Sequence, residues 1–444
     1  MGIRDLFLVG VLLPLLALAA ARPFVGVLVW SWISFMNPHR EVWGFASSLP
    51  WAMVTFVVTV FGCVVAREPK RLPLNAVTLM LIVFAVNITF TTAIAIGPPG
   101  PAWQLWDRTI KVILGLLLTA SLLTDRRRIH AMMWLMVISL GYYGVKGGIF
   151  TLMTGGGFRV LGPPDTMISD RNHLAVALLI TIPLMNYLRL NARHAIVRQG
   201  LAFAMASTLF AALGSQSRGA LVALVATTVV FWLRSRGKII TGVLLAVAVA
   251  GAIAFMPDSW VARMGTIRNY EEDGSAAARL RIWGVALDVA RSRPFTGGGF
   301  RVLYDVETVR RFRPQMTHAN AAHSIWLDVL AEHGFLGFAV WLGILAAGLW
   351  ASVRTVRLAK GRPGLRWAYD LARMSQVSAV AYMSGGTFLS LSYWDFFWTL
   401  LVVLGATHGL VVAAVRGEAK TAEPARAAVR AGWVRPVRQA AGRA

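Results

Sequence analysis

Long apolar runs separated by short basic connectors constrain this chain more than any other feature of its sequence. A helix that crosses a bilayer needs about 20 mostly apolar residues, and runs of that order follow one another through the 444 residues. Only 14% of the residues are charged, against about 25% in a typical soluble protein. We therefore predict an all-α, polytopic integral membrane protein.

The positions of the basic connectors predict which way each helix crosses. The apolar runs lie near residues 46–66, 75–96, 109–124, 130–153, 173–190, 197–213, 218–234, 238–256, 324–352, 370–392 and 395–415. The strongly basic connectors are 67–71, 125–128, 189–198, 234–238 and 354–366. Basic loops stay on the cytoplasmic side, so the alternating segments face outward, and these are 97–107, 154–172, 214–217, 257–322 and 393–394. With one N-terminal span, the pattern predicts about 12 transmembrane helices.

The N-terminal stretch 6–36 is the ambiguous part of this pattern. Arg22-Pro23 divides its apolar residues into two pieces, and the second piece is short for a span. We expect one span followed by an interfacial segment, whereas two crossings would place the N-terminus outside. A cleavable signal peptide over residues 1–21 is the competing interpretation, because Arg4, an apolar run and a small-residue stretch follow one another there.

Composition excludes several classes of function. The formal net charge is +24, but the basic residues cluster in connectors, which indicates topology rather than a nucleic-acid-binding face. The single cysteine, Cys63, rules out an intramolecular disulfide and a cysteine-based metal site. The predicted organisation is N-terminal transmembrane helices at 1–256, a large helical loop on the outward side at 257–322, C-terminal transmembrane helices at 323–415 and a basic cytoplasmic tail at 416–444.

The first candidate for chemistry is Arg218, which lies in a connection of only a few residues between two apolar runs. The connection is on the side predicted to face outward, so the arginine sits at the outer membrane boundary. An ionisable residue there is a candidate functional group, and an arginine that snorkels to lipid headgroups is the alternative.

The long loop supplies the second candidates, Arg279 and Arg281. The segment 257–322 contains ten arginines and no lysine, and guanidinium groups form forked bonds to phosphate oxygens. Two residues apart, the two arginines do not share a helical face, so we expect one in the site and the other in solvent or on a structural partner. The run Gly297-Gly298-Gly299 follows, and its amides could approach an anion or simply form a turn.

The third candidate is His323, at the point where the long loop enters an apolar run. A neutral histidine near its ordinary pKa of about 6.5 can accept a proton from a hydroxyl, and a satisfied interfacial histidine is the alternative. His318 is five residues away, a poor helical spacing for two metal ligands. The triplet Asp305-Val306-Glu307 is a weak metal signal, and we predict no metal site.

Two further polar residues share the outward side. Lys146 lies in the outer half of one apolar run, where it either contacts a phosphate or snorkels to the interface, and Asn172 begins the next run. We include both as candidate substrate-binding residues. The sidedness derived from the cytoplasmic connectors places Arg218, Arg279 and His323 on the same face of the membrane, which fits transfer from a lipid-linked pyrophosphate to a hydroxyl.

At these residues the chain resembles the bacterial O-antigen ligase family, which is related to O-antigen polymerases and to protein O-oligosaccharyltransferases. The elements that carry the resemblance are Ser217-Arg218-Gly219-Ala220, Arg279-(x3)-Trp283 with Pro294 to Gly299 after it, and His323 with Leu327, Glu332 and Gly337. The resemblance covers the whole span pattern and is clearest from Ser275 to Gly337. It implies a GT-C-like membrane architecture in the bacterial inner membrane.

The resemblance also implies a reaction. The family is expected to transfer a glycan from undecaprenyl pyrophosphate without metal, ATP or other cofactor, at the periplasmic face. By resemblance, Arg218 and Arg279 bind the pyrophosphate and His323 activates the acceptor hydroxyl, with inversion at the anomeric carbon. The expected acceptor is lipid A-core, but many relatives have asparagine where this chain has Ser324, so a glycan or a protein hydroxyl stays open. A glycan polymerase, a protein O-oligosaccharyltransferase and a lipid-linked glycan transporter are the alternatives.

Overall fold

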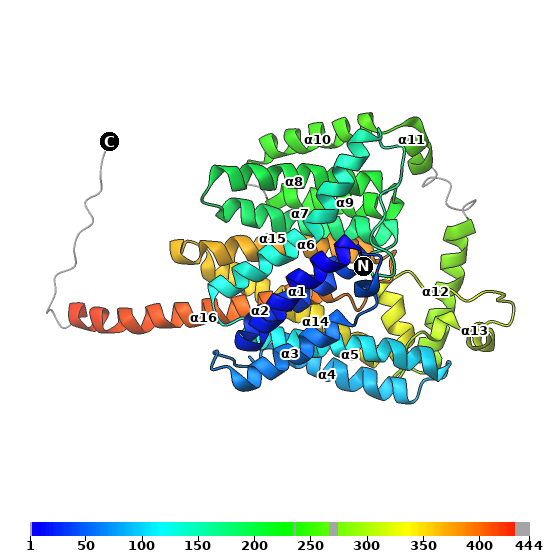
Figure 1. The fold of residues 1–444 in the computed structure, drawn as a ribbon, viewed down its shortest axis with the longest axis horizontal. Coiled ribbons are helices and arrows are strands. Elements are labelled where there is room, and N and C mark those ends of the chain that lie inside the picture. The colour runs from blue at the N-terminus through cyan, green and yellow to red at the C-terminus, as the bar shows by residue number, and fades with distance from the viewer. Residues whose placement is uncertain (1, 235–236, 266–273, 431–444) are drawn as a thin grey trace.

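The chain folds as a bundle of helices, and a computed structural model describes residues 2–234, 237–265 and 274–430 (Figure 1). No strand occurs in those residues, so the all-α prediction is confirmed there. The helices are α1 Ile3–Ala21, α2 Pro23–Met36, η1 Pro38–Arg40, η2 Phe45–Ser47, α3 Trp51–Val65, α4 Ala76–Ala93, α5 Pro99–Leu122, α6 Arg126–Met153, α7 Arg171–Asn191, α8 Ala195–Gly214, α9 Arg218–Arg234, α10 Lys238–Phe255, α11 Asp258–Gly265, α12 Gly274–Ser292, η3 Val302–Tyr304, α13 Val306–Phe312, α14 Ile325–Ala359, η4 Pro363–Leu365, α15 Arg366–Gly386 and α16 Asp395–Arg430.

Seven of the described helices are long and apolar enough to cross a membrane. They are α1, α4, α6, α7, α8, α14 and the Asp395–Glu418 part of α16. Three shorter apolar helices accompany them, namely α2, α3 and the Arg218–Leu233 part of α9. The chain is therefore a multi-pass membrane protein, and the total of about 12 spans stays a prediction.

The N-terminal helices form a hairpin that runs along the bundle twice. At one end of α3, the backbone amide of Ala46 donates a hydrogen bond to Asp5 near the start of α1, at 3.1 Å. Beyond the other end of α3, the carboxylate of Glu68 accepts from the amide of Phe24 at the start of α2, at 3.2 Å. Most of α2 is buried. The expected interfacial segment is therefore wrong, and α2 returns along the bundle so that both ends of the hairpin lie beside residues 37–46.

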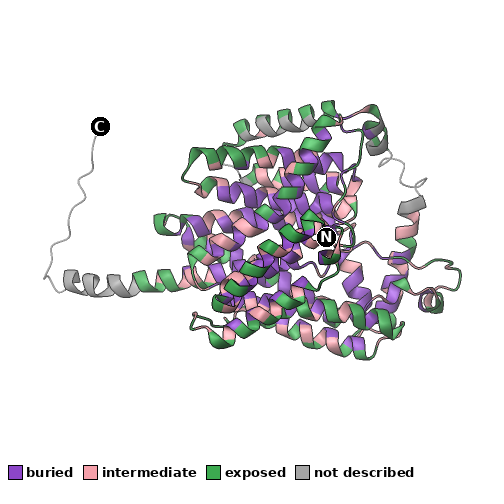
Figure 2. Cartoon of the chain, in the orientation of Figure 1, coloured by how far each residue is buried: buried purple, intermediate pink, exposed green. Residues whose placement is uncertain are grey.

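Helix α7 is the most enclosed helix that carries a predicted site residue. It packs against α6, α8, α9 and α15, and nearly every residue from Leu174 to Leu188 is buried. Figure 2 shows the buried residues gathered in the middle of the bundle and the exposed ones on its outer faces. Because α7 contacts four neighbours, its first turn is held firmly at one end of the bundle.

The segment 257–322 contains α11, α12, η3 and α13, as expected of a helical loop. It has a small core of its own, in which apolar residues of α12, η3 and α13 pack with Ala322 and with Ala331 of α14. Figure 1 shows α12 and α13 at the end of the bundle away from the C-terminal part of α16. That helix continues through the first part of the basic tail to Arg430, and residues 431–444 of the tail lie outside the described residues.

The glycine run anchors this loop to a kink in α14. Gly334 interrupts the helix with a φ of 67°, and the carbonyls exposed by the kink accept hydrogen bonds from the loop. The Gly298 amide donates to the Ala331 carbonyl at 2.8 Å, and the Gly299 amide donates to the Glu332 carbonyl at 2.9 Å. These two amides are therefore bound to protein, and the idea that they approach an anion is wrong.

Candidate functional site

A cavity of about 280 Å³ lies where the loop segment meets the bundle. Its lining consists of Arg171, Asn172, Gln216, Arg218, Gly219, Arg279 and His323. Four of these residues are candidates from the sequence, namely Arg218, Arg279, His323 and Asn172. The structure thus brings together residues that are up to 152 positions apart in the chain.

Arg218 is placed by the tight turn between α8 and α9. Ser217 caps α9, since its hydroxyl accepts from the Ala220 amide at 3.1 Å. Gln216 before it is buried and adopts a left-handed φ of 56°. Its side-chain nitrogen donates to the carbonyl of Gly156 at 3.3 Å. The turn is therefore held on both sides, and Arg218 becomes the first residue of a helix that starts at the cavity.

The first turn of α7 forms the opposite wall. Asp170 caps this helix by accepting from the Asn172 amide at 2.7 Å, and it also contacts the His173 ring at 3.3 Å. Burial raises the pKa of Asp170, but the hydrogen bonds from His173 and Asn172 outweigh it and hold the pKa below its ordinary value. The guanidinium of Arg171 donates to the carbonyl of Gln216 at 3.5 Å. This hydrogen bond links the start of α7 to the turn that precedes α9.

Helix α12 presents its two candidate arginines to different places. Arg279 lines the cavity, whereas Arg281 is exposed and lines a separate cavity of about 270 Å³ together with His318. Trp283, one helical turn after Arg279, donates from its indole nitrogen to the carbonyl of Ala322 at 2.7 Å. This bond ties α12 to the residue before His323. The structure therefore places Arg279 in the cavity beside His323, and Arg281 outside it.

His323 lies two residues before the start of α14, next to the N-cap residue Ser324. Its φ of 48° lies in the left-handed region, which costs a residue other than glycine about 1 kcal/mol or more and often marks a functional site. Burial lowers the pKa of His323 from 6.5, and electrostatic repulsion from Arg279 and His173 lowers it further, against a smaller opposite effect of Asp170. The imidazole is thus neutral at pH 7, the form that accepts a proton.

Three helices begin at this cavity. Helix α7 starts at Arg171, α9 starts at Arg218, and α14 starts two residues after His323. The N-terminus of a helix carries a partial positive charge, which favours anions. With three arginine side chains in the same lining, the cavity is suited to a group of high negative charge, such as a phosphate or pyrophosphate.

Other candidates lie elsewhere. Lys146 does not line the cavity. Its side chain is more than half exposed, and its ammonium group pairs with Glu41 at 3.3 Å. Asp305 caps α13 by accepting from the Thr308 amide at 2.9 Å, and Glu307 is exposed on that short helix. Among the described residues, no group of three or more His, Cys, Asp and Glu side chains is arranged to hold a metal ion.

The sequence analysis missed Arg171 and Gln216 as members of the lining. A signal for Arg171 was present, because aspartate followed by a long apolar run is a common helix start and Asp170 precedes this arginine directly. Gln216 had no such signal. Its place depends on the left-handed turn between two helices.

Two family models match the chain, and together they cover most of it. Residues 3–193 match a family of unknown function (DUF5935), and residues 202–342 match the O-antigen ligase family. No curated protein matches the chain. The second match contains Gln216, Arg218, Arg279 and His323, and it agrees with the resemblance found in the sequence. The chain is therefore a multi-pass membrane protein that contains a domain of the O-antigen ligase family at residues 202–342.

Proposed function

We propose that this protein transfers a glycan from undecaprenyl pyrophosphate to a hydroxyl of lipid A-core at the periplasmic face of the bacterial inner membrane. The family match supports a membrane glycosyltransferase-like enzyme of the O-antigen ligase or polymerase kind. The observation that carries the finer proposal is the cavity in which three arginines and one histidine with a lowered pKa come together.

Arg218 and Arg279 bind the pyrophosphate of the donor, and Arg171 adds a third positive charge. The starts of α7 and α9 contribute their amide dipoles to the same anion. When the glycosidic bond breaks, negative charge grows on the leaving pyrophosphate, and cationic groups already in place stabilise it without reorganisation. Such a site supplies the charge stabilisation for which other glycosyltransferases use a metal ion, so we propose a metal-independent reaction.

His323 accepts the proton of the acceptor hydroxyl. The hydroxyl oxygen forms a bond to the anomeric carbon, the bond from that carbon to the phosphate oxygen breaks, and undecaprenyl pyrophosphate leaves with the electron pair. The proton passes to the neutral imidazole of His323 and then to solvent. One displacement of this kind inverts the anomeric configuration.

The size and place of the cavity fit a lipid-linked donor. Its volume of about 280 Å³ is just below the roughly 300–1,000 Å³ of small-molecule sites. It holds the charged group, whereas the polyprenyl chain lies along the apolar helices and the glycan outside the bundle. The cavity is at one end of α7 and α9 rather than midway along them, which favours a GT-C-like enzyme over a transporter, whose polar site lies near mid-membrane.

The nearest alternative functions differ from the proposed one only in the acceptor molecule. A glycan polymerase or a protein O-oligosaccharyltransferase would use the same donor and the same His323 chemistry. Ser324, where many relatives have asparagine, is buried directly beside this histidine. It does not line the cavity, and its difference from those relatives is the reason to keep a glycan or protein hydroxyl as the second candidate acceptor.

Transfer in vitro tests the proposal. The purified protein is supplied with an undecaprenyl-pyrophosphate glycan and EDTA, with and without lipid A-core, as wild type and as the His323→Ala and Arg218→Ala variants. We expect acceptor-dependent product that both substitutions abolish, and full activity in His318→Ala, which changes an exposed histidine outside the cavity.

The other outcomes have distinct meanings. Glycan extension without lipid A-core would identify a polymerase, and glycan linked to a supplied peptide would identify a protein acceptor. Activity that EDTA abolishes and Mg²⁺ or Mn²⁺ restores would refute the metal-independent mechanism. No turnover with any acceptor, together with donor uptake into proteoliposomes, would establish a transporter.

A further inference from the structure

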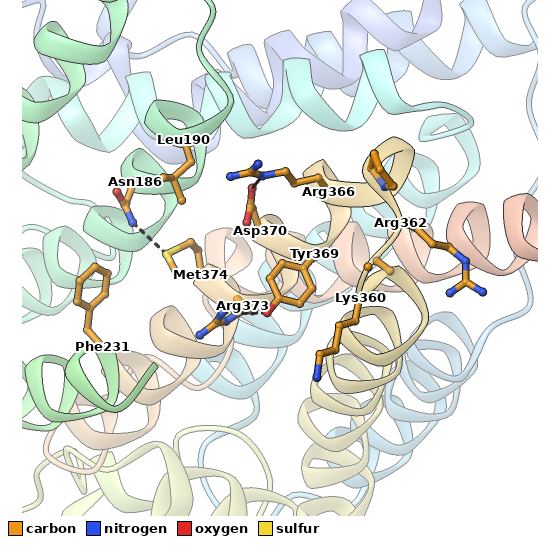
Figure 3. A pocket seen from close by; sticks show the side chains of 13 residues that line it. Asn186, Leu190, Phe231, Lys360, Arg362, Arg366, Tyr369, Asp370, Arg373 and Met374 are labelled. Atoms are coloured by element: carbon orange, nitrogen blue, oxygen red, sulfur yellow. Dashed lines mark hydrogen bonds and ion pairs between the residues drawn. The ribbon is translucent and has the colours of Figure 1, made fainter. Parts of the chain in front are cut away.

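A second cavity lies at the opposite end of the bundle and plays no part in the proposed reaction (Figure 3). It has a volume of about 620 Å³ and is formed by the turn between α14 and α15, the start of α15 and the last turns of α7 and α9. We propose that this cavity binds the phosphate headgroup of an anionic phospholipid. The proposal does not depend on the transfer reaction.

The charge of the cavity is the first argument. Its lining contains four cationic side chains and a single carboxylate, namely Lys360, Arg362, Arg366, Arg373 and Asp370. Two of the cations are paired, Arg366 with Asp370 at 3.8 Å and Arg362 with Glu418, outside the lining, at 3.2 Å. Four cationic groups thus face two carboxylates, and an excess of positive charge stays at the cavity. Arg373 is half-buried and its guanidinium donates to the Tyr369 hydroxyl at 2.9 Å, which fixes one cation against an aromatic ring inside the cavity. A phosphate anion is the complement of such a lining.

The apolar part of the lining favours a lipid over a free phosphate ion. Figure 3 shows Leu190 and Phe231 on one side of the cavity and Lys360 and Arg362 on the other. Leu190 is 50% exposed, although it belongs to the otherwise buried α7. A phospholipid presents a charged headgroup and apolar chains side by side, so it covers both halves of this lining. A free phosphate would leave the exposed leucine in contact with solvent.

The place of the cavity along α7 is the third argument. Arg171 starts this helix at the candidate active site, and Leu190 near its end lines the second cavity. At 1.5 Å per residue the two sites are roughly 30 Å apart, which is the thickness of the hydrocarbon layer. The second cavity therefore lies in the opposite headgroup region. The connector 354–366 beside it is basic, which predicts the cytoplasmic leaflet, where anionic lipids attract such segments.

Lipid titration of the full-length protein tests the proposal. The detergent-purified protein is titrated with short-chain phosphatidylglycerol, with phosphatidylcholine of the same chain length and with sodium phosphate, and bound ligand is counted by native mass spectrometry. The test variant is Lys360→Gln with Arg366→Gln, since both residues are exposed. The matched control is Arg354→Gln with Arg357→Gln, which removes two exposed charges from the end of α14 outside the lining. An unchanged elution profile confirms that each variant is folded.

We expect phosphatidylglycerol to bind at least tenfold more tightly than phosphatidylcholine. Loss of two cations near an anionic headgroup should weaken the binding of phosphatidylglycerol about thirtyfold in the test variant. In the control variant, the affinity for this lipid should change by less than threefold. Equal binding of the two lipids, or equal losses in test and control variants, would overturn the proposal. Displacement of phosphatidylglycerol by an equal concentration of sodium phosphate would also overturn it, by assigning the cavity to a free anion.

Discussion

The arginine pair on α12 offers the sharpest test of the candidate site. Arg279 and Arg281 have the same charge and belong to the same helix, two residues apart, but only Arg279 lines the cavity with His323. Replacing each by glutamine removes one positive charge and keeps a hydrogen-bonding side chain. The two variants therefore differ in little except which side of α12 loses its charge.

The expected effects differ by about two orders of magnitude. A guanidinium 4 Å from a phosphate charge interacts by about 4 kcal/mol at the effective dielectric constant of 20 that suits a half-buried pair. Loss of one group that stabilises a developing anion costs about 2.7–4 kcal/mol, or 10²–10³ in rate. Arg279 is half-buried and falls in this range. Arg281 is exposed, where a charge contributes about 0–1 kcal/mol, so its loss should lower the rate at most about fivefold.

The assay is the initial rate of glycan transfer from undecaprenyl pyrophosphate at saturating acceptor, as kcat and as kcat/KM for the donor. We expect Arg279→Gln to lower both, since the interaction strengthens as the leaving group gains charge. A rise in donor KM with an unchanged kcat would show that Arg279 binds the donor without assisting the reaction. Equal losses in the two variants, or a greater loss in Arg281→Gln, would refute the assignment of the cavity.

Three further outcomes follow from other parts of the structure. His323 must be neutral to act as the base, and its pKa is lowered from 6.5. As the pH falls, kcat/KM should therefore drop to half its maximum only below pH 6.5. A midpoint at or above pH 6.5 would contradict the role of His323 as the base. Trp283→Phe removes the 2.7 Å bond to the loop before His323, so the apparent Tm should fall by the equivalent of about 1 kcal/mol while transfer falls at least tenfold; equal transfer would refute the positioning role. Gly297→Ala should destabilise the protein by about 3 kcal/mol, because its φ is +58° and a Cβ would lie 2.5 Å from the Gly334 nitrogen. Gly155→Ala, with a φ of +59° but open space, should cost only about 1 kcal/mol, and denaturation in detergent compares the two.

The pattern of apolar runs was sufficient to predict most of the helices of the bundle. It gave the wrong prediction for the short helix α2. The long apolar runs and their basic connectors predict the helices from α3 to α10 and from α14 to α16, because each run must satisfy its backbone inside the membrane. The 14 residues of α2 are too few for a span by length alone. Helix α2 is mostly enclosed by other helices rather than by lipid, so the length rule does not govern it. Its return along the bundle depends on contacts such as Phe24 with Glu68, which no local pattern contains.

The candidate site was partly predictable for a related reason. Charge in the connectors predicts the depth of a residue along the membrane normal, and this placed Arg218, Arg279 and His323 at one end of the bundle. It says nothing about position within the plane of the membrane. Lys146 has the predicted depth but lies beside Glu41 instead of in the cavity. Arg171 has the same depth and does line it, since α7 packs against α9 and the turn before it.

The cavity combines residues from both of the regions that match family models. The O-antigen ligase domain at 202–342 supplies Arg218, Arg279 and His323, whereas Arg171 and Asn172 belong to the region 3–193, which matches a family of unknown function. Without that region the cavity would lose one of its three arginines and one of the three helix starts that favour an anion. The domain at 202–342 therefore does not form the cavity by itself, and the first region is part of the same functional unit. What it contributes is the rigid start of α7, held at the cavity by four neighbouring helices.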